Sequence, residues 1–236
     1  MKLSFSGERV LAVVAHPDDA ELLCAGTLAR AREDGAEVAI AVLCRGDKGQ
    51  PDRPIRQLAA RRRREMQAAA RLLGGKLFLA GFSDGELEPG VPERRRLLDI
   101  LRAFAPTLVL AHAPQDYHAD HRAASTLAEI ASWSCASQGY RTRRRAIDRA
   151  PALWWMDTIG MHQFEPSFYV DVSAHVGLKE RMLGCHRSQL ARGNDGDFSP
   201  LLDLMRLQFR ARGAQAGVAA AEAFRLHAAF KRTAAW

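Results

Sequence analysis

Two short clusters of histidine and aspartate are the residues of this sequence best suited to chemistry. The first, His16-Pro17-Asp18-Asp19, directly follows the apolar run Val10–Ala15, and the second, Asp116 to His121, comes shortly after Leu108-Val109-Leu110. An apolar run that ends in a polar turn before a helical pattern is typical of a buried strand, a turn and a helix. Ligand sites in open α/β sheets lie at the carboxyl ends of strands. Both clusters therefore stand where such a site is expected.

The residue types in these clusters match the needs of a hydrolytic zinc centre. A catalytic zinc ion takes three protein ligands, usually histidine and carboxylate, and keeps one position for water. His16 and Asp19 lie three residues apart in one turn, and the distant His121 would complete the set. Asp18 need not be a ligand, because successive turn residues point in different directions. A carboxylate beside the water of a zinc site is a general base, so the pattern predicts metal-dependent hydrolysis.

Two further roles follow from the second cluster. His118, three residues before His121, could protonate or polarise the reacting carbonyl group, and Asp120 or Asp116 could hold its imidazole in one tautomer. Each cluster could instead have only a structural role. The first could be a turn whose aspartate caps the next helix, and the second could be a solvated helix N-terminus. Both clusters follow apolar strands in one chain, and that combination favours chemistry.

The rest of the chain alternates between strand and helix patterns. Strands are expected at 9–15, 38–43, 77–79, 107–111, 154–159 and 168–172, and helices at 20–33, 56–73, 92–104, 121–136, 174–187, 199–213 and 217–230. This alternation predicts an α/β fold, a Rossmann-like, doubly wound, mostly parallel sheet with helices on both faces.

Three segments between these elements read as loops or turns. The polar loop 45–54 is a candidate wall of the site, 139–151 is a basic loop, and 194–197 is a turn. We expect residues 1–236 to form one domain whose part from about 139 is less regular.

Composition narrows the class of protein. With 47% hydrophobic and 26% charged residues in a chain of 236, the sequence is typical of a globular domain. No apolar run reaches membrane-spanning length and the start has no signal-peptide pattern, so we expect a cytoplasmic protein without membrane contact. The four cysteines form no C-x-x-C pair. We interpret them as reduced, buried thiols rather than disulfides or a cysteine metal site.

The net charge of +7 comes largely from the arginine runs Arg61–Arg64, Arg94–Arg96 and Arg143–Arg145. These runs contain no interleaved aromatic residues and match no nucleic-acid motif, so we expect no nucleic-acid partner. A solvated basic face, or attraction of an anionic small substrate, explains them better. The arginines and the loop 45–54 suggest a substrate that carries malate or phosphate on a glucosamine.

The two clusters also resemble the signatures of a known family. The segments Ala15-His16-Pro17-Asp18-Asp19-Ala20-Glu21 and Asp116-Tyr117-His118-Ala119-Asp120-His121-Arg122 are similar to those of the PIG-L/LmbE-like N-acetylglucosaminyl deacetylases, and weaker matches extend the resemblance over about residues 9 to 190. The resemblance implies a single LmbE-like domain. It also implies zinc-dependent removal of acetyl from an N-acetylated amino sugar, as in bacillithiol- or mycothiol-pathway deacetylases.

The resemblance assigns the central roles residue by residue. It implies His16, Asp19 and His121 as zinc ligands and Asp18 as the general base that activates water. Iron, cobalt or manganese also suit such a ligand set, so Zn²⁺ is the expected metal and Fe²⁺ an alternative.

Further roles come from the same resemblance. His118 matches the histidine that stabilises the tetrahedral intermediate or assists the leaving amine, and Asp120 matches its orienting carboxylate. Arg62 and Asp84 resemble positions that hold the sugar or its aglycone. Some members place a glycine, and a tyrosine of the carbonyl pocket, just ahead of the histidine pair. Here Tyr117 directly precedes His118, so we expect its side chain to point elsewhere and assign it no catalytic role.

Two alternatives remain open on the sequence. An amidase of a thiol-sugar conjugate, or of another small amide, would use the same catalytic set. A non-catalytic sugar- or nucleotide-binding protein would use the same crevice but would need no general base at Asp18. Family members are often oligomeric, and we expect a homo-oligomer.

Overall fold

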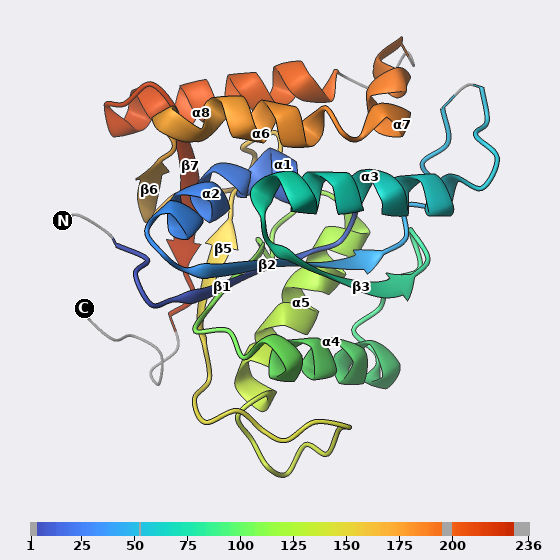
Figure 1. The fold of residues 1–236 in the computed structure, drawn as a ribbon, viewed down its shortest axis with the longest axis vertical. Coiled ribbons are helices and arrows are strands. Elements are labelled where there is room, and N and C mark those ends of the chain that lie inside the picture. Colours follow the sequence, from blue (N-terminus) through green and yellow to red (C-terminus); the bar gives the residue numbers. More distant parts are fainter. Residues whose placement is uncertain (1–3, 52, 195–199, 229–236) are drawn as a thin grey trace.

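The strands of the described residues form one seven-stranded sheet in the order β3-β2-β1-β4-β5-β7-β6 (Figure 1). The computed structural model describes residues 4–51, 53–194 and 200–228. The strands are β1 Arg9–Val14, β2 Glu37–Cys44, β3 Lys76–Phe82, β4 Leu108–His112, β5 Ala152–Met156, β6 Phe168–Asp171 and β7 Ala221–Leu226. Among the described residues, no helix combines the length and apolar character needed to cross a membrane.

Helices cover both faces of this sheet, as the alternating strand and helix patterns predict (Figure 1). They are α1 Asp19–Leu23, α2 Ala25–Glu33, α3 Leu58–Leu73, α4 Val91–Phe104, α5 Ala119–Ser134, α6 Val176–Leu183, α7 Arg187–Leu190 and α8 Leu201–Ala216, with short 3-10 turns η1 Ser173–His175 and η2 Ala191–Asn194. The predicted α/β class, with a mostly parallel sheet and helices on both faces, is confirmed.

The central strand β1 shows how the core is divided into two layers. Successive side chains of a strand point to opposite faces. Val10 and Val14 therefore join one buried cluster with α2, α3, α6 and α8. Leu11 and Val13 join the other cluster, with α4 and α5. Because β1 is buried on both faces, its sequence is a continuous apolar run rather than an alternating one.

The topology places the two predicted clusters side by side. Strand β1 pairs in parallel with β2 on one side and with β4 on the other. The connections diverge from β1 in opposite directions, and this leaves a crevice at the carboxyl ends of β1 and β4. The turn His16–Asp19 follows β1, and the segment Asp116–His121 follows β4 and leads into α5.

Two predicted helices are interrupted in the structure. The segment 20–33 divides at Cys24, whose backbone (φ −148°, ψ 7°) is not helical, into α1 and α2. The segment 174–187 divides into η1, α6 and the start of α7. Residues 139–151 form no helix or strand, as expected, and 195–197 of the predicted turn lie outside the described residues.

The helix predicted for 217–230 is wrong. Residues Ala221–Leu226 form β7, which runs antiparallel to both β5 and β6. Alanine, glutamate and leucine favour a helix locally, but the pairing of Phe224 and its neighbours between two strands outweighs that preference. The strand also delivers Glu222 into the core, at 4% exposure.

Glu222 joins three elements through one buried carboxylate. It accepts hydrogen bonds from the backbone N–H groups of Gly26 (2.9 Å) and Thr27 (2.7 Å) at the start of α2 and from Lys179 Nζ (2.6 Å) on α6. The Lys179 side chain is 1% exposed, and its ammonium also donates to Leu22 O. The carboxylate therefore supplies the N-terminal partner that α2 needs after the break at Cys24.

We expect Glu222→Ala to cost about 3–5 kcal/mol of unfolding free energy, because it leaves the Lys179 charge buried without its partner. Urea denaturation followed by circular dichroism measures the loss. The matched control is Glu180→Ala, which breaks the more exposed Glu180–Arg206 pair (2.7 Å) and is expected to cost about 1 kcal/mol or less. Equal losses in the two variants would contradict the assigned role of Glu222.

Candidate active site

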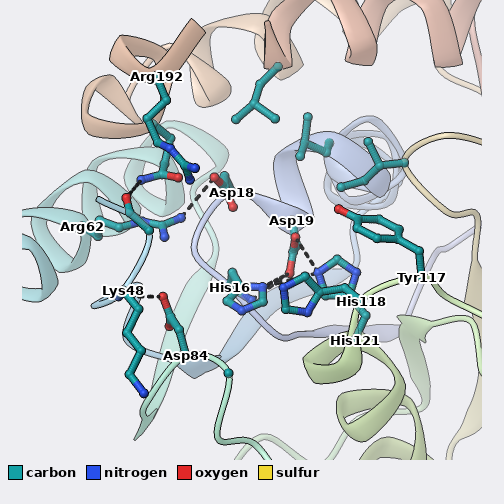
Figure 2. A pocket seen from close by; sticks show the side chains of 16 residues that line it. His16, Asp18, Asp19, Lys48, Arg62, Asp84, Tyr117, His118, His121 and Arg192 are labelled. Carbon is teal, nitrogen blue, oxygen red and sulfur yellow. Dashed lines mark hydrogen bonds and ion pairs between the residues drawn. The ribbon is translucent and has the colours of Figure 1, made fainter. Parts of the chain in front are cut away.

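A pocket of about 360 Å³ opens at the carboxyl ends of β1, β2 and β4 and is lined by both clusters (Figure 2). Its walls include His16, Asp18, Asp19, Arg62, Asp84, His118 and His121, together with Lys48 and Gly49 from the predicted loop wall 45–54. Seven of the eight predicted site residues thus line one cavity. Asp120 is not in its lining and lies behind His16.

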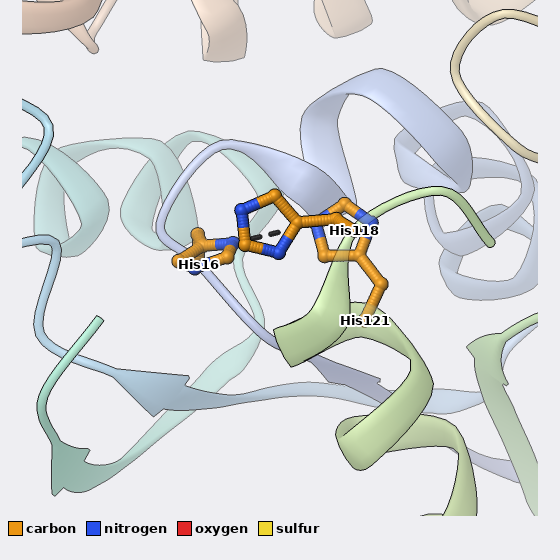
Figure 3. A group of neighbouring side chains, drawn as sticks. All are labelled: His16, His118 and His121. Carbon is orange, nitrogen blue, oxygen red and sulfur yellow. Dashed lines mark hydrogen bonds between the residues drawn. The ribbon is translucent and has the colours of Figure 1, made fainter. Parts of the chain in front are cut away.

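Three side chains in this pocket form a triangle of the size that a metal ion requires, and Asp19 faces the two histidines through different carboxylate oxygens. His16 Nδ1 lies 3.3 Å from His121 Nε2 (Figure 3), Asp19 Oδ1 lies 3.4 Å from the same Nε2, and Asp19 Oδ2 lies 3.5 Å from His16 Nδ1. In a tetrahedral zinc site with bonds of about 2.0–2.2 Å, the ligand atoms lie about 3.3–3.6 Å apart. The three predicted ligands therefore fit a zinc ion.

A carboxylate stands behind each of the two candidate metal histidines. Asp120 Oδ2 lies 3.0 Å from His16 Nε2, and Asp116 Oδ1 lies 3.0 Å from His121 Nδ1. Such carboxylate partners fix the tautomer and orientation of metal-binding imidazoles. The predicted pairing of Asp120 or Asp116 with the His118 ring is thus not what the structure shows.

The charges of these carboxylates favour positive charge at the centre of the site. Burial works against protonation of His16, but its hydrogen bond to Asp120 and the charge of Asp19 raise its pKa to about 10. Burial likewise opposes protonation of His121, yet Asp19 and Asp116 raise its pKa to about 9. A bound cation would replace this proton charge, which is a second reason why the residues fit a metal.

Asp18 lies beside the triangle in a strained position. Its backbone φ of 106° lies in a region that residues other than glycine rarely adopt, and such strain is concentrated at functional sites. Arg62 Nη2 donates to Asp18 Oδ2 at 3.1 Å. Burial raises the pKa of the Asp18 carboxyl, Arg62 lowers it and Asp19 raises it, with a net increase. A carboxylate with a raised pKa suits a general base.

His118 is held by the backbone instead of by a carboxylate. It is the N-cap of α5, and its Nδ1 accepts a hydrogen bond from the Asp120 backbone N–H at 3.1 Å. Burial, with smaller contributions from His121 and His16, lowers the pKa of His118. In the neutral ring Nε2 then carries the proton, so His118 offers a hydrogen-bond donor in the pocket wall.

Arg62 and Asp84 both line the pocket, but their polar groups are engaged by the protein. Arg62 is 3% exposed while its neighbours in the arginine run are exposed, and it binds Asp18 and Pro17 O. Asp84 accepts from the backbone N–H groups of Gly46 (2.7 Å) and Lys48 (3.2 Å). In this geometry Arg62 orients Asp18, and Asp84 shapes the loop that walls the pocket.

Sequence reasoning missed His112, a fully buried residue at the end of β4. Its Nε2 lies 3.2 Å from Asp19 Oδ2, and its ring stacks on that of His121 with centroids 4.0 Å apart. His112 thus contacts two of the three candidate ligands, Asp19 and His121. The sequence contains one signal for this role: His112 directly follows the apolar run Leu108–Ala111, and the carboxyl end of a parallel strand is where side chains reach the site.

Comparisons with known proteins show the family to which the chain belongs. Residues 11–132 match the model of the family described as PIG-L, GlcNAc-PI de-N-acetylase. The diacetylchitobiose deacetylase of Thermococcus kodakarensis is 27% identical over 189 residues, covering 77% of this chain and 70% of that protein. The 4-oxalmesaconate hydratase of Pseudomonas putida is 26% identical over 189 residues, covering 76% and 73%.

Structural similarity extends over nearly the whole chain. The crystal structure of the conserved protein TT1542 from Thermus thermophilus superposes with a TM-score of 0.80 at 33% identity, covering 94% of this chain and 95% of that one. The family match spans more than half of the 236 residues and contains both His/Asp clusters. It confirms the resemblance found in the sequence and makes the protein a deacetylase, an enzyme that hydrolyses amide bonds. The chain belongs to the PIG-L family of de-N-acetylases.

Proposed function

We propose that this enzyme is a zinc-dependent hydrolase that removes the N-acetyl group from an N-acetylglucosamine-type conjugate, releasing the free amine and acetate. The observation that carries the proposal is the triangle of His16, Asp19 and His121 atoms beside the buried carboxylate of Asp18. The named activity of the Thermococcus relative, a diacetylchitobiose deacetylase, supports the amino-sugar substrate.

The protein groups divide the chemistry among them. A zinc ion held by His16, Asp19 and His121 would polarise the acetamide carbonyl and make a water molecule more acidic. Asp18 takes a proton from the attacking water, while Arg62 keeps its carboxylate in place. The Nε2–H of His118 donates to the carbonyl oxygen as that oxygen becomes negative. The proton on Asp18 then passes to the nitrogen, and the C–N bond breaks to give amine and acetate.

Charge in the pocket wall supports an anionic substrate. Lys48 and Arg192 lie on the same side of the pocket as Arg62, and Tyr117 lies on the other side (Figure 2). Lys48, whose ammonium also pairs with Glu86, and Arg192 add positive charge to this wall, and that charge would attract an anionic aglycone. The sugar would then lie between this wall and the exposed ring of Tyr117 (69% exposed).

The test is acetate release from a panel of N-acetylglucosamine conjugates with neutral, phosphorylated and malyl aglycones. We expect release from at least one conjugate, and kcat/KM about tenfold or more higher for the anionic conjugates than for neutral ones of equal size. Equal turnover of neutral and anionic members would remove the basis for an anionic substrate. Absence of acetate from every member would contradict the proposed function.

A second candidate is hydrolysis of another small amide on the same catalytic set, such as a thiol-sugar conjugate. The hydratase among the relatives shows that sequence similarity at this level is compatible with a different named reaction. Adding simple amides and an unsaturated dicarboxylic acid to the panel separates these activities, because their products differ from acetate and glucosamine.

A further inference from the structure

A second group of metal-binding atoms lies on the far side of His16 from the candidate zinc centre. A ring nitrogen of His16, the sulfur of Cys44 and a carboxylate oxygen of Asp120 all lie within 4.8 Å of one another. Since Nε2 of His16 is 3.0 Å from Asp120 Oδ2, this is the nitrogen that faces the group. The other ring nitrogen, Nδ1, faces His121 in the first centre.

The fold fixes Cys44 in this position. Cys44 is the last residue of β2, and its backbone N–H donates to Ala15 O at 2.7 Å, which aligns it with the residue that precedes His16. Its side chain is 2% exposed, and Asp120 is 1% exposed. In the sequence Cys44 lies near the strand ends of the predicted site, but a single cysteine without a C-x-x-C partner does not by itself indicate a metal site.

Negative charge accumulates around the Cys44 sulfur. Burial raises the pKa of this thiol, and the carboxylates of Asp120, Asp84, Asp19 and Asp47 raise it further. The thiol is therefore neutral and a poor nucleophile. The same carboxylates create a negative potential that favours a cation at this point, and a metal ion is the agent that deprotonates a buried cysteine most effectively.

We propose that Cys44, Asp120 and Nε2 of His16 form a second, weaker binding site for a thiophilic divalent cation such as Zn²⁺, and that its occupation inhibits the enzyme. Sulfur, imidazole nitrogen and carboxylate oxygen are all zinc ligands. The 3.0 Å between Nε2 and Oδ2 is a hydrogen-bond distance, and the two atoms would move apart by about 0.3 Å or more to share one tetrahedral zinc ion. Binding releases two protons to solvent, one from Nε2 and one from the Cys44 thiol.

Inhibition follows from the shared histidine, and this part of the inference rests on the proposed function. A cation on Nε2 withdraws electron density from Nδ1 and ends the hydrogen bond through which Asp120 orients the ring. The second cation binds more weakly than the first because it lies close to another positive charge. The site is therefore filled only at excess metal.

Cobalt distinguishes the two sites by absorption, because a thiolate ligand adds an intense sulfur-to-cobalt charge-transfer band and the first centre contains no cysteine. We would titrate the metal-stripped, full-length protein with Co²⁺. The expected result is visible ligand-field absorption with the first equivalent and the charge-transfer band only with the second. Cys44→Ala should lose the band and keep the first phase, and Cys44→Ser provides a second variant of nearly unchanged volume. The matched control is Cys135→Ala, another buried thiol, which should keep both.

Activity supplies the second readout. Excess Zn²⁺ should lower acetate release by wild type about tenfold or more relative to one equivalent, and Cys44→Ala should relieve this inhibition. A missing charge-transfer band, or one that persists in both Cys44 variants, would overturn the site. Equal inhibition of wild type and Cys44→Ala would overturn the inhibitory role. The cobalt titration needs no substrate, so its outcome stands even if no conjugate is hydrolysed and the proposed function fails.

Discussion

Asp18→Asn should lower kcat/KM for deacetylation by about 10²- to 10⁴-fold, the range that a general base contributes. That change corresponds to about 3–5 kcal/mol of lost transition-state stabilisation. Asparagine preserves the shape of the side chain but cannot take the proton of the attacking water. Steady-state kinetics of acetate release measure the effect, and zinc content should remain at the wild-type level because Asp18 is not one of the three triangle residues.

The matched control for this substitution is Asp84→Asn. It removes the same charge from the same pocket, at a residue that is also 7% exposed, but at a carboxylate whose oxygens accept from the backbone of loop 45–54. We expect a loss of about tenfold or less. Asp18→Asn also leaves the buried Arg62 without its charged partner, so its melting temperature must be recorded beside its activity. Comparable losses in both variants, or near-normal turnover by Asp18→Asn, would remove the assignment of Asp18 as base.

His121→Ala should weaken zinc binding by more than about 100-fold and abolish deacetylation. It deletes one of the three donors and leaves two, whereas loss of an outer hydrogen-bond partner alone typically costs about 10- to 100-fold in metal affinity. Competition with a chromophoric chelator measures the zinc affinity directly. Because that measurement needs no substrate, it tests the ligand set independently of the reaction.

A graded pair of variants sharpens this test. Asp116→Asn keeps all three donors but removes the charge 3.0 Å from His121 Nδ1, so its loss of affinity should be smaller, about 10- to 100-fold. His175→Ala changes a histidine that pairs with the exposed Glu33 and should leave zinc affinity unchanged. If His121→Ala bound zinc as tightly as His175→Ala does, the triangle would not be the metal centre.

Much of the site could be predicted because its residues follow the ends of strongly apolar strands. The runs Val10–Ala15 and Leu108–Leu110 identify two buried parallel strands, and their carboxyl ends must deliver His16 and His121 to one edge of the sheet. Local sequence is sufficient for that inference, since both clusters closely follow their strands.

The partners of the site residues could not be predicted, because they depend on packing between distant elements. Asp120 is two residues from His118 in sequence but contacts His16, 104 residues away. Arg62 stands in a run of four arginines that have the same local pattern, and only the inward face of α3 separates it from its exposed neighbours. Distance along the chain gives no information about either contact.

The error in β7 has a related cause. The segment Ala221–Leu226 has residues that favour a helix, and its strand conformation depends on the edges presented by β5 and β6. The proximity of Cys44 to His16 likewise arises from the pairing of β2 with β1. In both cases the deciding contacts join residues that lie far apart in the sequence.

The link between the metal and amide hydrolysis can be measured directly. The measurement is acetate release by metal-stripped enzyme as zinc is added in steps, with the conjugate that is the best substrate in the panel. We predict negligible release without zinc and a rise to a maximum near one zinc per chain, the occupancy of the His16, Asp19 and His121 centre. Full activity in the stripped enzyme, or none at any zinc level while the metal is bound, would contradict that link.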